Sequence, residues 1–66
     1  MKLTQTQKLL IYGLRQFPIA EEEQEAIFLF LHDDESKMQQ MIDYLAANLE
    51  ATSEEIMNKA GEIITA

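Results

Sequence analysis

The chain has 66 residues, with five Lys or Arg against twelve Asp or Glu, and therefore a formal net charge of −7. A chain of this length forms one domain, and we take residues 1–66 as a single helical domain. The absence of cysteine excludes disulfides, thiolate metal sites and thiol nucleophiles. The negative charge repels phosphate backbones, so we expect no direct binding of nucleic acid.

Neither a secretion signal nor a membrane span is expected. The first residues carry no apolar stretch of the kind that a signal peptide needs. The longest apolar run covers residues 26–31, whereas a membrane span needs about 20 residues. Together with the lack of cysteine, this predicts a cytoplasmic protein that does not enter a membrane.

The charges are unevenly distributed along the chain. Residues 1–17 carry Lys2, Lys8 and Arg15 and no acid, which gives +3, whereas residues 18–66 carry all twelve acids against two lysines, which gives −10. We expect the basic first segment to lie against an acidic surface, either its own or that of a partner. Surface ion pairs contribute only about 0–1 kcal/mol each, so they would orient such a contact rather than hold it together.

The first predicted helix covers about residues 4–17. Thr4 and Gln7 have the spacing of a capping box at its start, and Phe17 before Pro18 is expected to end it. Gly13 flanks the apolar face, where it would allow another backbone to approach closely. The residues expected on that face are Leu3, Leu10, Leu14 and Phe17.

The second predicted helix covers about residues 20–31 and contains the apolar run at 26–31, which is apolar on every side of the helix. Such a helix is either the centre of a compact bundle or shares its second face with another chain. Phe28 is expected on the flank and Leu29 almost opposite the core. A strand at 27–31 is the alternative, but nothing else in the chain would pair with it. The main buried face is expected to hold Ala20, Ile27, Phe30 and Leu31.

Two further helices are predicted after residue 32. Asp33 or Asp34 caps the third, whose apolar stripe is Met38, Met41, Ile42, Leu45 and Leu49. Thr52 opens a capping box for the fourth, unless Gly61 ends that helix early; its apolar residues are Ile56, Met57, Ala60, Ile63 and Ile64. The fold class is therefore all-α, a small bundle of three to four short antiparallel helices.

No catalytic, cofactor-binding or metal site is expected. His32 with Asp33, Asp34 and Glu35 is the natural candidate for metal or acid–base chemistry, but an intervening helix boundary spoils a shared face. We interpret it as an acidic helix junction with a solvent-facing histidine. The glutamates at 21–25 suit an exposed first turn of a helix. Because no nucleophile–base pair and no glycine-rich phosphate loop are present, the chain is not expected to be an enzyme.

Residues 51–61 (ATSEEIMNKAG) resemble the first helix and turn of a helix-turn-helix unit, in which a capped short helix closes on Ala-Gly. Only five residues follow Gly61, which is too few for the recognition helix that such a unit requires. The resemblance implies DNA binding only if the third helix or a partner supplies the missing part.

Phe28 and Leu29 exceed what a single core stripe needs, and Glu25 and His32 surround them. Tyr12 and Arg15 fall together on the rear of the first helix. We predict that these six residues bind a partner, in a protein–protein interaction module that self-associates as a homodimer and can act on a further protein. In a two-fold dimer the +3 helix of one chain would meet the acidic second helix of the other.

The alternative prediction is an acidic regulator of nucleic-acid transactions, which imitates a phosphate array or acts as a partial helix-turn-helix accessory protein. It depends on the acidic row of the second helix and on the junction at 33–35.

Overall fold

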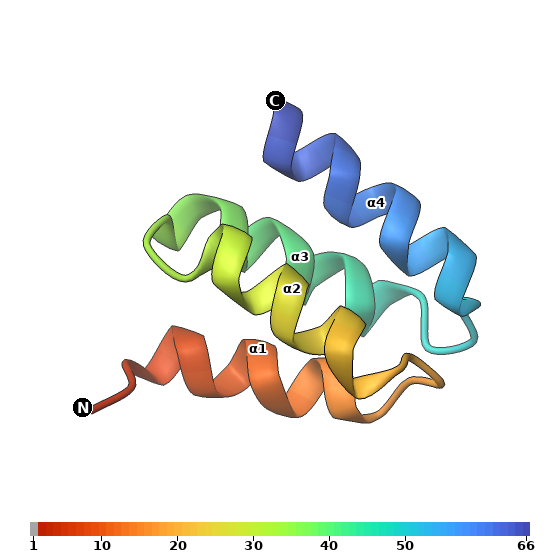
Figure 1. Cartoon of the computed structure of the whole chain (residues 1–66), viewed down its shortest axis with the longest axis horizontal. Coiled ribbons are helices and arrows are strands. Elements are labelled where there is room, and N and C mark those ends of the chain that lie inside the picture. Colours follow the sequence, from red (N-terminus) through yellow and green to blue (C-terminus); the bar gives the residue numbers. More distant parts are fainter. Residues whose placement is uncertain (1) are drawn as a thin grey trace.

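The computed structural model describes residues 2–66 and contains four α-helices: α1 (Gln5–Arg15), α2 (Glu21–Leu31), α3 (Glu35–Ala47) and α4 (Ser53–Thr65). Figure 1 shows α1 and α2 side by side and antiparallel, with α3 behind them and α4 packed across the far side. Helices α2 and α3 each contact the other three. The predicted all-α bundle is confirmed with four helices, and the alternative strand at 27–31 is wrong because those residues belong to α2.

Side-chain caps begin three of the four helices. The Thr4 hydroxyl accepts from the backbone N–H of Gln7, and Thr52 makes the same contact with Glu55. Asp34, rather than Asp33, caps α3 by accepting from the N–H of Lys37. These contacts satisfy amide groups that the first turn of a helix leaves unpaired.

Helix α2 begins differently, at Ala20. The backbone N–H of Ala20 donates to Oε1 of Glu23, but alanine has no side-chain acceptor for the return contact. Three glutamates in the first turn stabilise this end, because their negative charges are attracted to the positive end of the helix dipole. None of the four helices in residues 2–66 has both the length and the apolar character needed to cross a membrane.

One hydrophobic core joins all four helices. Most of the predicted apolar stripes enter it, and Phe28, Ile42, Tyr44, Met57 and Ile64 pack against its edge. The chain between α1 and α2 contributes Ile19, and the chain before α4 contributes Ala51. The buried residues are Leu10, Leu14, Phe17, Ile19, Ile27, Leu31, Met38, Met41, Leu45, Ala51, Ile56, Ala60 and Ile63.

Four residues predicted on buried faces are exposed. Phe30 and Ala20 lie outside the core of α2, because Ile27 and Leu31 set which side of the helix faces inward. Leu49 is 77% exposed because α3 ends at Ala47, so the helical spacing no longer places it on the stripe. Leu3 is exposed because it precedes the cap of α1. The end of α1 was also placed too late, since the helix stops at Arg15.

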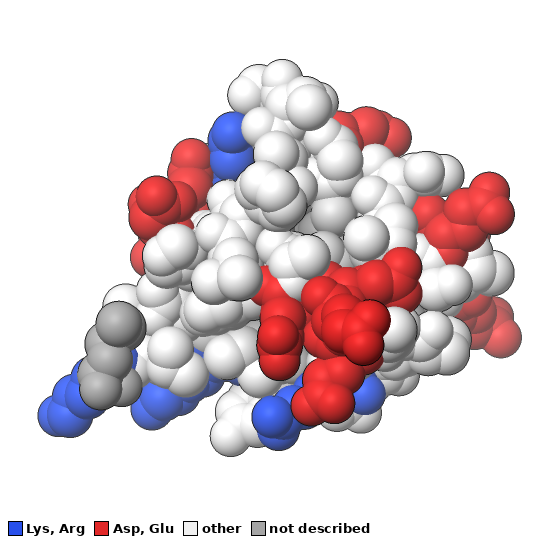
Figure 2. All heavy atoms as spheres, viewed as in Figure 1, with Lys and Arg blue, Asp and Glu red and all other residues white. Residues whose placement is uncertain are grey.

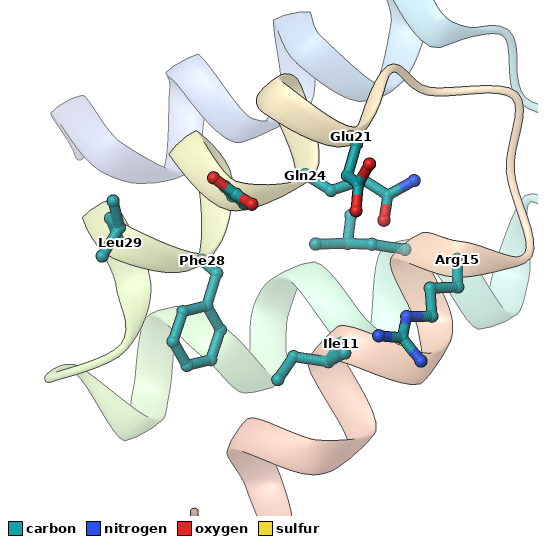
Figure 3. A pocket seen from close by; sticks show the side chains of 8 residues that line it. Ile11, Arg15, Glu21, Gln24, Phe28 and Leu29 are labelled. Atoms are coloured by element: carbon teal, nitrogen blue, oxygen red, sulfur yellow. The ribbon is translucent and has the colours of Figure 1, made fainter.

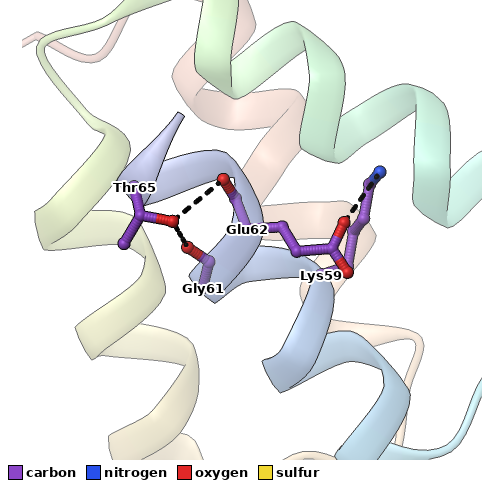
Figure 4. A network of polar contacts seen from close by, with 4 residues as sticks. All are labelled: Lys59, Gly61, Glu62 and Thr65. Atoms are coloured by element: carbon purple, nitrogen blue, oxygen red, sulfur yellow. Dashed lines mark hydrogen bonds and ion pairs between the residues drawn. The ribbon is translucent and has the colours of Figure 1, made fainter.

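The alternative in which Gly61 ends the last helix is wrong, because α4 continues through it to Thr65. Figure 4 shows the Thr65 hydroxyl reaching back to the carbonyl oxygens of Gly61 (2.9 Å) and Glu62 (3.4 Å). Lys59 and Glu62 form an exposed ion pair at 3.8 Å on the same helix. The last two turns of α4 are therefore regular helix.

Candidate interaction surface

An open pocket of about 310 Å³ lies between α1 and α2 and brings together four of the six predicted partner-binding residues. Arg15 comes from α1, whereas Glu25, Phe28 and Leu29 come from α2. Figure 3 shows the ring of Phe28 and the side chain of Ile11 turned into the same space, with Arg15 and Glu21 at the other end. The pocket is lined by Ile11, Leu14, Arg15, Glu21, Gln24, Glu25, Phe28 and Leu29.

His32 adjoins this pocket through Phe28. The two rings are stacked, with centroids 5.9 Å apart and an interplanar angle of 29°. Nδ1 of His32 lies 2.9 Å from the carbonyl oxygen of Leu29; because a carbonyl only accepts, this nitrogen is the donor. The histidine thus closes the end of α2 and supports the ring that forms one wall of the pocket.

Side-chain contacts hold the start of α1 against the end of α2. Nε2 of Gln7 donates to the backbone carbonyl of His32 at 2.9 Å, and the Thr6 hydroxyl donates to the carboxylate of Glu35 at the start of α3. At the opposite end, Gln24 donates to the carbonyl of Ile19 at 2.9 Å. The start of α1 is therefore tied to the end of α2, and the Gln24 contact holds the connecting segment against α2.

Tyr12 lies near the pocket but does not line it. It is 59% exposed, and it is about 100° around α1 from Ile11. Arg15 is about 60° from Tyr12 on the same helix, so both side chains belong to the outer surface of α1. The predicted grouping of Tyr12 with Arg15 on the rear of this helix agrees with the structure, where both are exposed.

The two helices that form the pocket carry opposite charges. Figure 2 shows acidic side chains gathered over the first half of α2 and basic side chains along α1 beneath it. Within residues 2–66 the one ion pair at 4.0 Å or less joins Lys59 and Glu62, so neither Arg15 nor Lys8 is neutralised by a close carboxylate of its own chain. Charge of both signs is thus available to a second molecule at this surface.

Phe30 is the exposed aromatic residue that the sequence interpretation missed. It is 65% exposed, the same fraction as Leu29, but it lies about 160° around α2 from Phe28 and therefore on the side away from α1. The run at 26–31 has no polar residue to mark which side faces out. The available signal was Glu23, which stands seven residues before Phe30 and therefore lies on the same side of the helix.

Residues 2–66 contain no group of three or more His, Asp or Glu side chains that would hold a metal ion. The acidic junction at 33–35 is divided by the helix boundary, with Asp34 engaged as the cap of α3. In the same described part of the chain, every buried side-chain nitrogen or oxygen has a hydrogen-bond partner. The core of the described residues therefore holds no unpaired polar side-chain atom that could bind a ligand.

The resemblance of residues 51–61 to a helix-turn-helix unit does not extend to the backbone. The unit needs a turn at Gly61, whereas this residue lies inside the continuous helix α4 and has no positive φ. The residues after it complete the same helix. The geometry that would place a second helix across the first is therefore missing.

The chain was compared with protein-family models, curated proteins and solved structures, and it matches none of them.

Proposed function

We propose that the chain is a non-enzymatic protein–protein interaction module that self-associates as a homodimer through the outer surface of α1 and α2. We call this surface the α1–α2 face and define it by Ile11, Tyr12, Arg15, Glu25, Phe28, Leu29 and His32. The observation that carries the proposal is the open pocket, whose wall includes the half-buried Phe28 and the 65% exposed Leu29. Apolar surface gathered in a groove and rimmed by charge is typical of a contact site.

The area needed by a stable dimer favours a contact with both helices. A standard interface buries about 800 Å² on each partner, while the whole chain exposes 4555 Å². The exposed side of α2 alone is too small for this, because α2 has 11 residues and is only about 16 Å long. A contact that includes α1 as well as α2 offers a larger surface.

Two substitutions of matched exposure test the proposal. Leu29 and Phe30 are neighbours in the sequence, and both are 65% exposed, but only Leu29 lines the pocket. We expect Leu29→Asp to give a folded monomer and Phe30→Asp to remain dimeric in sedimentation velocity, with circular dichroism as the check on folding. A monomeric wild-type chain, or a dimer that Leu29→Asp leaves intact, contradicts the proposal.

Salt distinguishes this function from the alternative of an acidic regulator. A complex held by the apolar groove persists at high salt, whereas a complex that depends on the acidic row of α2 weakens steeply, because salt screens exposed charges. We further propose a cytoplasmic location, in keeping with the cysteine-free sequence. A tagged chain expressed in cells and separated by fractionation tests this.

A further inference from the structure

We infer that the two-fold axis of the homodimer runs along the groove between α1 and α2, so that α1 of each copy lies over α2 of the other. This inference rests on the homodimer proposed above and specifies how the second copy occupies the pocket. The two pockets then face each other and form one shared apolar centre, and the four helices make an antiparallel bundle.

Two arrangements of the α1–α2 face are compatible with a two-fold dimer. If the axis runs across the helices, each helix lies on its own counterpart, α1 on α1 and α2 on α2. If the axis runs along the helices, α1 of one copy lies on α2 of the other, and α2 of the first copy lies on α1 of the second. The distribution of charge decides between these arrangements.

The first arrangement gives the charges no partner of opposite sign. Helix α1 carries Lys8 and Arg15 and no acid, whereas α2 carries four glutamates, all at 21–25, and no base. An axis across the helices makes each pair antiparallel, so the glutamates of one α2 lie against the apolar end, residues 27–31, of the other. Such a contact is unfavourable, because it removes carboxylates from water without pairing them.

The second arrangement places opposite charges together. Arg15 and Glu21 line the same end of the pocket, and Gln7 contacts His32 at the other end of the two helices. An axis along the groove preserves position along the helices, so Arg15 meets the Glu21–Glu25 end of the partner's α2. Tyr12, three residues earlier and 59% exposed, then lies at about the level of Phe28 in the second copy.

Side chains from both copies surround the shared apolar centre and cover it from solvent. Ile11 and Phe28 form the wall of one pocket and meet the same pair from the second copy across the axis. Leu29 and Tyr12, which are exposed in the single chain, become covered at the edges. An apolar centre with a charged rim is the usual anatomy of a protein interface.

Cysteine trapping tests the arrangement, because the chain contains no cysteine of its own. Two single variants, Arg15→Cys and Glu25→Cys, are purified separately, mixed and oxidised, and the disulfide-linked heterodimer is quantified by mass spectrometry. A disulfide requires Cα atoms within about 7 Å. We expect the mixture to form the R15C–E25C link faster than either variant links to itself.

Self-linking of Glu25→Cys is the discriminating control. With the axis along the groove, the two α2 helices are diagonal neighbours about 11–14 Å apart, which is too far for a disulfide. With α2 packed antiparallel on α2, the axis crosses near the middle of Glu21–Leu31, so position 25 lies close to its own counterpart and links to itself. Rapid formation of an E25C homodimer, with no R15C–E25C link, overturns the inference while leaving the homodimer intact. A monomeric chain in sedimentation velocity overturns both.

Charge exchange gives an independent readout. We expect Arg15→Glu to weaken the dimer about tenfold, because two symmetric contacts are turned repulsive. The double variant with Arg15→Glu and Glu25→Arg restores affinity if the two positions face each other across the interface. If the second change weakens the dimer further, the pairing is wrong.

Discussion

Gly13 of α1 lies directly against Leu45 of α3: a Cβ atom at Gly13 would stand 3.3 Å from Cδ1 of Leu45. Gly61 of α4 has nothing within 4 Å of the same position. Both glycines are helical and neither has a positive φ. The first is therefore a packing residue, although its close neighbour is a side chain and not the backbone that the sequence predicts, and the second is not.

Gly61→Ala is expected to raise the free energy of unfolding by about 1 kcal/mol, because alanine is the better helix former and meets no neighbour. Gly13→Ala is expected to gain clearly less, because Leu45 has to move by a few tenths of an ångström to admit the methyl group. Urea unfolding of the two variants measures the difference. Equal gains would show that Leu45 moves at no cost.

Ala20→Ser is expected to stabilise the protein by about 0.5–1 kcal/mol. Ala20 occupies the cap position of α2 with extended backbone (φ −60°, ψ 146°) but has no side-chain acceptor. A serine hydroxyl would accept from the N–H of Glu23 and complete the contact that Glu23 already makes in return. Thermal unfolding checks this, and an unchanged or lower Tm would contradict it.

Thr52→Ala tests the opposite change at the start of α4. Its hydroxyl accepts from the N–H of Glu55 at 3.2 Å, and Glu55 returns a contact to the N–H of Thr52 at 2.8 Å. Loss of this cap is expected to lower the free energy of unfolding by about 1 kcal/mol. Thr52→Ser keeps the acceptor and should remain close to the wild type in the same urea titration.

Leu31→Ala is expected to lower the free energy of unfolding by about 2–5 kcal/mol, because it leaves a cavity in the core. Leu31 is 0% exposed, whereas Leu49 is 77% exposed, so Leu49→Ala is the matched control and should change stability by less than about 0.5 kcal/mol. A domain of this size has little stability in reserve, so partial unfolding of the Leu31 variant in buffer is also expected. Circular dichroism with and without urea measures both. Similar losses at the two positions would show that the core does not depend on Leu31.

Helix boundaries were predicted well wherever a polar residue marks them. The spacing of Thr4 and Thr52 from the following Gln or Glu is enough to predict the helix starts. A hydroxyl followed three residues later by Gln or Glu satisfies two backbone amide groups at once. For α3 the sequence predicts Asp33 or Asp34 as the cap residue, and the structure shows that it is Asp34. The end of α3 carries no such mark, and for this reason Leu49 was wrongly assigned to the stripe.

The candidate surface was predicted in part. The charge difference between the first and second helices can be read directly from Lys8, Arg15 and the glutamates at 21–25. That Arg15 and Glu25 line one pocket could not be read, because it depends on the angle and offset at which α1 packs on α2. Sequence spacing describes one helix at a time and contains no information on either quantity.

The sequence by itself determined an all-α bundle of three to four helices and the helix ends that carry caps, because capping and helical periodicity are local interactions. It also determined the uneven charge. Only the tertiary structure decided which side of the apolar run faces inward. Leu31 is buried and Phe30 exposed although either fits an apolar face, because the core is filled by whichever rotation of α2 packs best against α1, α3 and α4. That choice leaves Leu29 at the edge of the groove and gives the chain its candidate interface.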